Sequence, residues 1–586
     1  MATTGETKTT GSGDAPGPRK QPGWMRSAKR YGPIAAVVVL IAGAVVLFGG
    51  GGDDGDGDDA VSGTGTATED ELVLSGPMTP QKAELEGETD VDFGPNCDTE
   101  TGRIKLISVY APPCVEPFEG DNGGATSPGV TADEVKVIYY QADPALDPLA
   151  AATASNAGAQ IDPESARKTA QDFVDLYNKL FEGYGRTIVV ESFTGTGAPS
   201  DTEAARNDAI TIAEKEPFAV IGGPTQSSAV FAGEIASNGI VCGPGCSLSL
   251  NEDIVEELEP YVWQAGATPN QASALAAEMV GNLAGPGPAE LAGDEAMKTQ
   301  DRVYGLVHYD TPDGDHQPVF EALSAALADN GVDLAIDIEF TLDLARAQEN
   351  ARTNIGKLMD AGVTTVIYYG DPLTPASLTA EATAQGYFPE WILGPNTLMD
   401  TTLFARDTDP TQWQNGFGMS LTGARGERST NGAFQIYEWA YGTEPPNTNV
   451  NILEPYLRTI FYGVHLAGPE LTPETFRDGL LRYPVSGGGP TEPQVSRGDH
   501  GVWPDFDWGG TDDMAIIWFD PAVTGEDEVG NEGTGMYRYA NGGERYTIGN
   551  LPASLEEAGL FDVESSVTVF DEVPAEDQTP DYPPPG

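Results

Sequence analysis

The chain has 586 residues and a formal net charge of −61, with 91 Asp and Glu against 30 Lys and Arg. A charge of this size repels phosphate backbones and anionic lipids, and no concentrated basic patch offsets it, so the composition excludes a nucleic-acid-binding protein. The length exceeds what one ordinary hydrophobic core organises and therefore predicts two or three domains with tails.

The first element expected along the chain is a membrane anchor. Residues 31–52 contain no charged residue, and as a helix they are long enough to span the hydrocarbon layer of a bilayer. A basic cluster precedes this segment and an acidic run follows it, so the positive-inside rule predicts a cytoplasmic segment at 1–32, an anchor at 33–50 and an extracytoplasmic remainder. A cleaved signal peptide is the alternative, but the apolar run ends in Phe48 and glycines rather than in a small-residue cleavage site.

An acidic linker and a cysteine-containing extension are expected next, at 51–128. The sequence has four cysteines, an even number, and an oxidising compartment favours their pairing. Their spacing predicts a disulfide between Cys97 and Cys114, which would hold the extension. A second disulfide, between Cys242 and Cys246, would close a loop.

From residue 130 onward, short apolar strands alternate with amphipathic helices, a pattern typical of a parallel sheet covered on both faces. Apolar residues at helical spacing, such as Phe173, Leu176, Tyr177 and Leu180, indicate the first long helix. The first set comprises strands at 135–140, 187–191, 218–222, 239–241 and 261–265 and helices at 164–183, 202–216 and 226–238.

The alternation restarts after a Gly- and Pro-rich stretch at 285–293, which predicts a second doubly wound sheet in tandem with the first. The expected fold class is therefore α/β with two lobes, an N-terminal transmembrane helix and disordered tails. The second set comprises strands at 303–309, 335–340, 364–369 and 390–393 and helices at 317–330, 348–361 and 376–385. It is followed by helices at 432–441, 456–468 and 473–481, a strand at 514–519 and a hairpin at 536–547.

Several stretches of this region can be compared with known families. They are Gly129–Val137, Phe218–Ser228, Tyr368–Asp371, Trp518–Pro521 and Met536–Tyr539. Their order and spacing resemble the Leu/Ile/Val-binding family of ABC-transporter substrate-binding proteins, which has the type I periplasmic-binding fold. The resemblance covers roughly residues 129–550.

In that family the chain crosses the hinge between two lobes three times, and the resemblance implies a corresponding division here. The first lobe would comprise 129–268 and a return segment at 425–510. The second lobe would comprise 269–424 and C-terminal strands at 511–565. Residues 566–586, rich in Pro and acidic residues, are expected to form a disordered tail.

The candidate binding loop follows the third strand of the first lobe. Thr225, Gln226, Ser227 and Ser228 lie between that strand and a helix, so their hydroxyl and N–H groups are placed to bind a carboxylate or another polar oxygen. The resemblance implies the same role. The alternative is that Thr225 or Ser227 merely caps the helix. Ser247 belongs to the next loop, where Gly-Pro-Gly-Cys-Ser replaces the family's usual run of small residues, so the resemblance does not extend to amino-acid specificity.

The second lobe offers Tyr309, Asp310, Asp371 and Asn396, each at the end of a predicted strand. An acidic residue there would suit an ammonium group, with Asp371 as the first candidate and Asp310 as the second. The alternative is that both are ordinary turn residues at strand ends. In the first lobe, Tyr140 is a candidate for an aromatic wall of the pocket or for a packing residue of the core.

No catalytic motif accompanies these residues. The sequence lacks a nucleophile elbow, a phosphate-binding loop, a Cys-x-x-Cys pair and a His-Glu-x-x-His motif, and its four histidines are too scattered for a metal cluster. We therefore expect neither an enzyme nor a bound cofactor or metal. The sequence instead predicts a receptor that captures a small polar solute, such as an amino acid or an amide, and delivers it to an ABC permease with its ATPase. A membrane-tethered sensor or envelope interaction protein without a transport role is the alternative.

Overall fold

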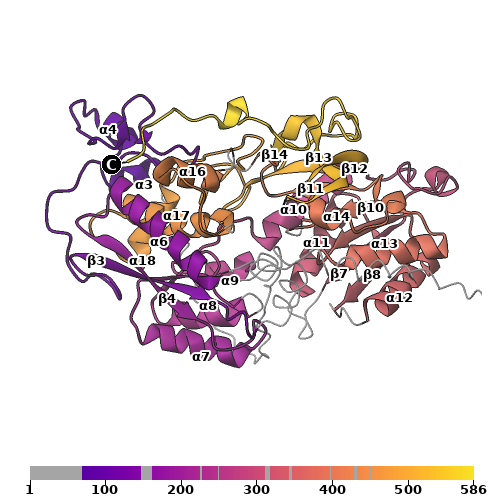
Figure 1. Cartoon of the computed structure of the whole chain (residues 1–586), viewed down its shortest axis with the longest axis horizontal. Coiled ribbons are helices and arrows are strands. Elements are labelled where there is room, and N and C mark those ends of the chain that lie inside the picture. Colours follow the sequence, from indigo (N-terminus) through magenta and orange to yellow (C-terminus); the bar gives the residue numbers. More distant parts are fainter. Residues whose placement is uncertain are drawn as a thin grey trace, which may run out of the picture.

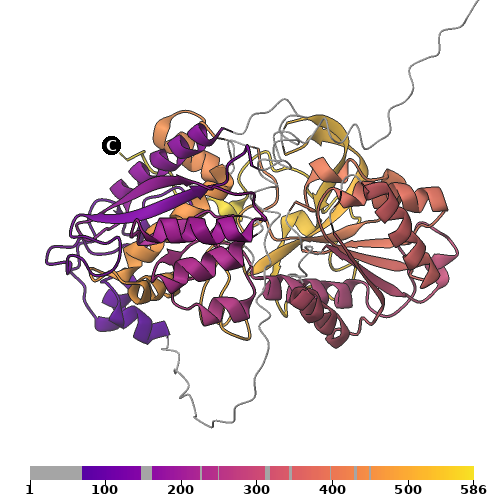
Figure 2. The same cartoon turned by 90° about the horizontal axis from the view of Figure 1, so that it is seen from below.

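The computed structural model describes residues 69–146, 162–224, 227–247, 250–309, 317–341, 343, 346–395, 398–427, 430, 432–447, 450–528 and 530–585. The predicted cytoplasmic segment at 1–32 and the predicted anchor at 33–50 lie outside these residues. None of the described helices combines the length and the hydropathy that crossing a bilayer requires. Two α/β lobes lie side by side in the described part of the chain (Figure 1, Figure 2).

The first lobe is built on a parallel sheet that has four described strands. In sheet order they are β4 (Thr187–Thr194), β3 (Glu134–Gln141), β5 (Ala219–Ile221) and β6 (Val241–Cys242). On the central strand β3, Val135 and Val137 face one side, and Ile138 and Tyr140 face the other. Both sides of the sheet are therefore apolar and have to be covered. The strand expected at 261–265 was wrong, because only a single bridge forms there, between Val262 and Cys242.

Helices from two distant parts of the chain cover this sheet. They are α6 (Pro163–Leu180), α7 (Thr202–Ala213), α8 (Ser228–Ser237), α16 (Gly432–Tyr441), α17 (Val450–Ala467) and α18 (Pro473–Leu481). Asp162 caps α6 by accepting the N–H of Glu164. Residues of α6 and α16 to α18 form the core on the Val137 side, whereas α7 and α8 pack on the Tyr140 side. The helices after residue 430 thus complete the first lobe (Figure 1).

The second lobe has a larger, mixed sheet. Its described strands, in sheet order, are β13 (Glu532–Tyr539), β12 (Asp513–Glu526), β11 (Phe417–Ser420), β10 (Glu390–Leu393), β9 (Thr365–Tyr369), β7 (Tyr304–Tyr309) and β8 (Leu334–Phe340). Strands β7 to β11 are parallel to their neighbours, and β12 is antiparallel to both β11 and β13. The prediction of a hairpin at 536–547 was wrong, because β13 and β14 (Arg545–Thr547) both pair with β12 and not with each other.

Helices also cover both faces of the second sheet. They are α10 (Pro269–Leu283) and α11 (Gln317–Asp329) on one face, and α12 (Ala347–Asp360), α13 (Thr374–Gln385), α14 (Thr402–Ala405) and α15 (Pro410–Trp413) on the other. The sequence analysis missed α10. Its capping box, in which Thr268 and Gln271 exchange hydrogen bonds, marks the helix start.

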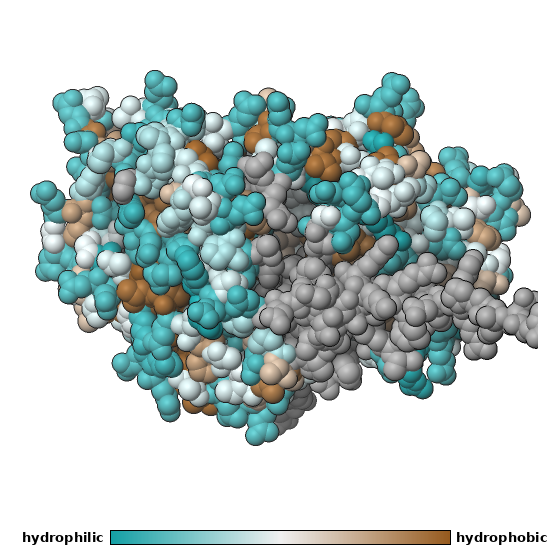
Figure 3. All heavy atoms as spheres, in the orientation of Figure 1, coloured by the Kyte–Doolittle hydropathy of each residue, from teal (hydrophilic) through white to brown (hydrophobic). Residues whose placement is uncertain are grey.

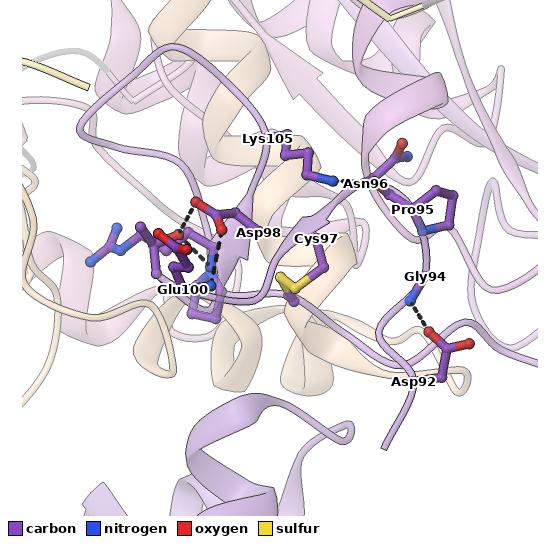
Figure 4. The surroundings of a disulfide bond; sticks show 12 residues. Asp92, Gly94, Pro95, Asn96, Cys97, Asp98, Glu100 and Lys105 are labelled. Carbon is purple, nitrogen blue, oxygen red and sulfur yellow. Dashed lines mark hydrogen bonds between the residues drawn. A yellow bond between two sulfur atoms is a disulfide. The ribbon is translucent and has the colours of Figure 1, made fainter. Parts of the chain in front are cut away.

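A disulfide-bonded extension precedes the first lobe. It contains α3 (Glu69–Ser75), α4 (Pro80–Glu86), β1 (Cys97–Asp98) and β2 (Arg103–Ile104). Cys97 and Cys114 are bonded and belong to the same core as Val137 (Figure 4). Cys242 and Cys246 form the other disulfide. Both predicted pairings are confirmed, and the extension is part of the first lobe's core rather than a separate unit.

The described chain passes between the lobes along three connections, at 263–268, 421–427 with 430, and 482–512. The third is tied to the first by buried polar groups. Gln271, at the start of α10, donates from Nε2 to Oδ1 of Asp507 at 2.6 Å, and Arg497 donates to the carbonyl of Gln264 at 2.7 Å. These bonds join neighbouring connections at the base of the two lobes.

The tail expected to be disordered at 566–586 is described as far as residue 585 and packs on the molecule. Phe570 pairs with the second connection at Gly426, and Asp577 accepts the N–H and the hydroxyl of Thr491 on the third. Tyr582 then donates to Asp98 of the disulfide-bonded extension at 2.7 Å. The tail is therefore a strap that returns to the first lobe. It is held by these polar contacts and by Val567 and Phe570, which pack against a core of the second lobe.

Candidate functional site

The candidate loop begins where β5 ends, at the carboxyl edge of the first sheet. Gly222 has a φ of +70°, and a Cβ there would lie 2.4 Å from the carbonyl oxygen of Tyr140, so this tight turn requires glycine. Ser227 is fully buried, and its Oγ donates to the carbonyl of Pro199 at 3.0 Å. Ser228, also fully buried, opens α8. Thr225 and Gln226 lie outside the described residues.

Ser227 does not cap α8 through its side chain. Ser227 occupies the N-cap position of α8, yet its side chain makes no capping hydrogen bond to the helix. Its hydroxyl proton instead ties the loop to the carbonyl of Pro199. Among the described residues, no hydrogen bond to the lone pairs of Ser227 Oγ is found.

Ser247 holds the second loop in place. The disulfide between Cys242 and Cys246 closes this loop, and Ser247 Oγ donates to the carbonyl of Trp263 at 2.6 Å, on the first connection. Ser247 is fully buried, so its hydroxyl proton is used within the protein. The two loops also contact each other, because a Cβ on Gly223 would lie 2.9 Å from the carbonyl of Gly245. The carboxyl ends of β5 and β6 thus bring both candidate loops together.

Tyr140 lies in the core of the first lobe, on the side of the sheet covered by α7 and α8. Its hydroxyl donates to Asp208 Oδ2 at 3.1 Å, and its ring packs on Phe193 and Phe231. Burial is the main reason that the pKa of Tyr140 lies far above its ordinary value. The next tyrosine back along the strand, Tyr139, faces the opposite side of the sheet and lies against the Gly222 turn.

Sequence reasoning missed a pair of polar residues at the same edge. Gln141, the last residue of β3, accepts a hydrogen bond from Arg167 Nη1 at 3.0 Å and donates to the carbonyl of Pro163. Arg167 lies in the second turn of α6. The available signal was a cation near the start of the helix that follows the first strand, in a chain where cations are scarce.

In the second lobe, Asp371 acts as a local cap. Its Oδ1 accepts the backbone N–H groups of Leu373 and Thr374, each at 2.8 Å, and its Oδ2 accepts the Thr374 hydroxyl at 2.6 Å. The hydroxyl of Tyr368 lies 3.4 Å from the same Oδ2. Burial raises the pKa of Asp371, although these hydrogen bonds oppose the rise. The contacts favour the turn interpretation, and an ammonium group would have to share oxygens that are already in use.

The remaining second-lobe candidates are only partly described. Tyr309 ends β7, is half-buried and packs edge-on against Phe340, with 6.2 Å between ring centroids. Asp310 and Asn396 lie outside the described residues.

A polar pocket of about 460 Å³ lies elsewhere, beside the third connection. It is lined by Gly488, Gln494, Asp513, Glu544, Arg545, Tyr546, Thr547, Asn550, Pro552 and Glu557. Within it, the guanidinium of Arg545 is paired with Asp513 at 2.9 Å and is fully buried. The predicted site residues are not part of this lining.

Comparison with known proteins gives solved structures of related shape. No protein-family model matches the chain, and neither does any curated protein. A fatty acid ABC transporter substrate-binding protein from Thermomonospora curvata is 15% identical, with a TM-score of 0.47, and the match covers 73% of this chain and 96% of that one. An ABC transporter substrate-binding protein from Desulfitobacterium hafniense in complex with Leu is 12% identical, with a TM-score of 0.41 and coverage of 71% and 99%.

A third similar structure is a solute-binding protein of an ABC transporter from Rhodopseudomonas palustris in complex with p-hydroxybenzoic acid. It is 11% identical, with a TM-score of 0.46, and the match covers 71% of this chain and 98% of that one. All three are solute-binding proteins of ABC transporters.

Proposed function

We propose that the chain is an extracytoplasmic solute-binding protein that captures a small polar solute between its two lobes. One observation carries the proposal: the glycine-rich turn at Gly222 and the disulfide-closed loop at Gly245 meet at the carboxyl edge of a parallel sheet. Ligands of open α/β sheets bind at such edges, where helix N-termini and loop N–H groups converge. The second lobe brings the carboxyl ends of β7, β9 and β10, also parallel, to an edge of its own.

The proposal extends to delivery. We infer that an ABC permease and its ATPase receive the solute and that the segment at 33–50 tethers the protein to the membrane. The family resemblance supports the importer, and the charge pattern around the apolar segment supports the tether. Co-purification of a permease with the full chain from membranes is expected. A permease-free preparation in which solute binding is intact would instead favour a sensor.

Solute binding itself is tested by thermal melting of the full chain against amino acids, amides, organic acids, polyamines and sugars. A solute at about a thousand times its Kd stabilises the folded state by about 4 kcal/mol, so the matching class raises the melting temperature clearly. The follow-up substitution is Thr225→Ala in the candidate loop, which is expected to weaken binding of that class by about three- to tenfold for the loss of one hydrogen bond. The control is Thr211→Ala, because Thr211 is exposed on α7 and, among the described residues, its hydroxyl bonds only to the carbonyl of Asn207. A folded chain that responds to no class contradicts the proposal.

A further inference from the structure

Arg167 makes few contacts with the described residues. No ion pair joins it to a carboxylate in the described part of the chain. The same is true of the buried Arg186 and Arg497, which donate to backbone carbonyls, whereas Arg302 has a carboxylate partner. Its side chain is half-buried, and only Nη1 makes a hydrogen bond among the described residues. A guanidinium carries five N–H donors, so the described residues occupy only a small part of its donor capacity.

The side chain is held in position rather than free on the surface. Gln141 is buried, and its Nε2 donates to the carbonyl of Pro163 at 3.3 Å, which directs its Oε1 toward Arg167. Both ends of this arrangement are fixed by regular structure, because Gln141 ends β3 and Pro163 begins α6. The guanidinium is therefore presented at the carboxyl edge of the first sheet.

This edge is the one that carries the candidate loop. Tyr139, two residues before Gln141 on β3, lies against Gly222, since a Cβ on that glycine would be 3.4 Å from Tyr139 Cε2. Burial raises the pKa of Tyr139 to about 12, while its hydrogen bond with Gln141 and the charge of Arg167 oppose the rise. Arg167, Gln141 and Tyr139 thus form a continuous polar row that leads to the turn preceding Thr225.

We propose that Arg167, with the Tyr139 hydroxyl beside it, binds an anionic group of the solute, so that the substrate class is organic anions bearing a carboxylate. The inference rests on the proposed function and specifies further that the solute is negatively charged. In a chain of net charge −61, long-range electrostatics repel such a solute, and affinity for it requires a local cation with free donors. The planar guanidinium fits a carboxylate through two parallel hydrogen bonds.

The test uses the full chain and three matched pairs of probes that differ in charge: glutamate and glutamine, succinate and succinamide, benzoate and benzamide. At least one acid is expected to bind about tenfold or more tightly than its amide, as measured by calorimetry. Arg167→Gln should then weaken binding of that acid by about 10- to 100-fold, the size of a charge-assisted hydrogen bond, and leave the amide unaffected. Arg167→Lys keeps the positive charge but removes the planar guanidinium with its two parallel N–H donors. Its Kd for the acid should lie between those of the native chain and of Arg167→Gln.

The matched control is Lys179→Gln, which removes the same charge from the other end of α6, where Lys179 is exposed. It is expected to leave the Kd for the acid within about twofold, because a distant exposed charge is screened by salt. Equal binding of an acid and its amide, or an unchanged Kd in Arg167→Gln, contradicts the proposal that Arg167 binds an anionic group. The proposed solute-binding function would not be affected by that result. A folded chain that binds none of the probes and no member of the wider panel contradicts the proposed function itself.

Discussion

Two buried carboxyl groups on the third connection share one hydroxyl. Asp507 and Asp512 are almost completely buried, and Ser496 Oγ lies 3.2 Å and 2.8 Å from an oxygen of each. Burial raises the pKa of Asp507, and burial followed by the charge of Asp507 raises the pKa of Asp512 to about 7. The buried Arg497 lies near both carboxyls and favours their charged forms, while Asp513 next in sequence is paired with Arg545.

This pair makes the stability of the protein depend on pH. In the unfolded chain Asp512 loses its proton near its ordinary pKa of 3.8, whereas the folded protein keeps that proton up to about pH 7. The folded state therefore loses stability as pH rises from about 4 to about 7, and the loss is complete above that range. Asp512→Asn removes the ionisation and should be more stable than the native chain by about 2 kcal/mol at pH 8, with a smaller difference at pH 5.

Urea unfolding at the two pH values measures this difference. Asp499→Asn is the control, because Asp499 is exposed on the same connection. If Asp512→Asn and the native chain keep the same stability difference at both pH values, the carboxyl pair does not titrate in this range.

The strap formed by residues 566–585 is the feature that sequence reasoning misjudged most at the scale of elements. Asp577 anchors it, since Oδ2 accepts the backbone N–H of Thr491 at 2.8 Å and its hydroxyl at 2.7 Å. A Cβ on Gly489 would lie 1.9 Å from Asp577 Oδ1, so a glycine there makes room for the carboxylate. The strap contacts the second and third connections on its way to the first lobe.

Asp577→Ala should lower the free energy of unfolding by about 1–3 kcal/mol, because the N–H of Thr491 loses its partner in a half-buried place. Glu576→Ala is the matched neighbour, with an exposed side chain, and should change stability by less than about 0.5 kcal/mol. Chemical denaturation compares the two. Equal effects of the two substitutions would show that the strap is not held at Asp577.

The sequence predicted best those elements whose apolar residues recur with a regular helical or strand period. Helix α6 was predicted from Phe173, Leu176 and Tyr177 at helical spacing, and these residues are fully buried in the first core or nearly so. Helix α10 was missed because its small, mostly apolar residues show little periodicity, although Thr268 and Gln271 carried a capping signal. Pairing of β14 with β12 joins residues that are 30 to 34 positions apart, which local patterns do not encode.

In the candidate site, too, features marked by local sequence patterns were predicted and long-range contacts were not. The loop around Ser227 and the disulfide loop at Cys246 were predicted because each lies just after a predicted strand. The contacts of Asp371 with Leu373 and Thr374 are local, so the sequence could offer them as the turn alternative. The contact of Tyr140 with Asp208 joins residues far apart in the chain and depends on where side chains meet in three dimensions. Arg167 was missed because its position near the start of a helix marks it only as a scarce cation, and its contact with Gln141 joins residues that are far apart in the chain.

The whole molecule combines two separately packed lobes with a polar exterior. Each sheet has a hydrophobic core on both faces, and the cores of the two lobes are distinct. The described residues on the face seen in Figure 3 are mostly hydrophilic, with apolar residues in small scattered groups. Two lobes with separate cores, joined by polar connections, are suited to move as rigid bodies about the connections.

The central claim, that the lobes close on a solute, is tested most directly by the distance between them. Ile210 on α7 and Met359 on α12 are exposed residues of the first and the second lobe, and spin labels at these two positions report that distance in the full chain. Adding a solute that raises the melting temperature should shift the distance distribution to a new, narrower value. An unchanged distribution under conditions in which calorimetry shows the protein saturated would contradict capture by lobe closure.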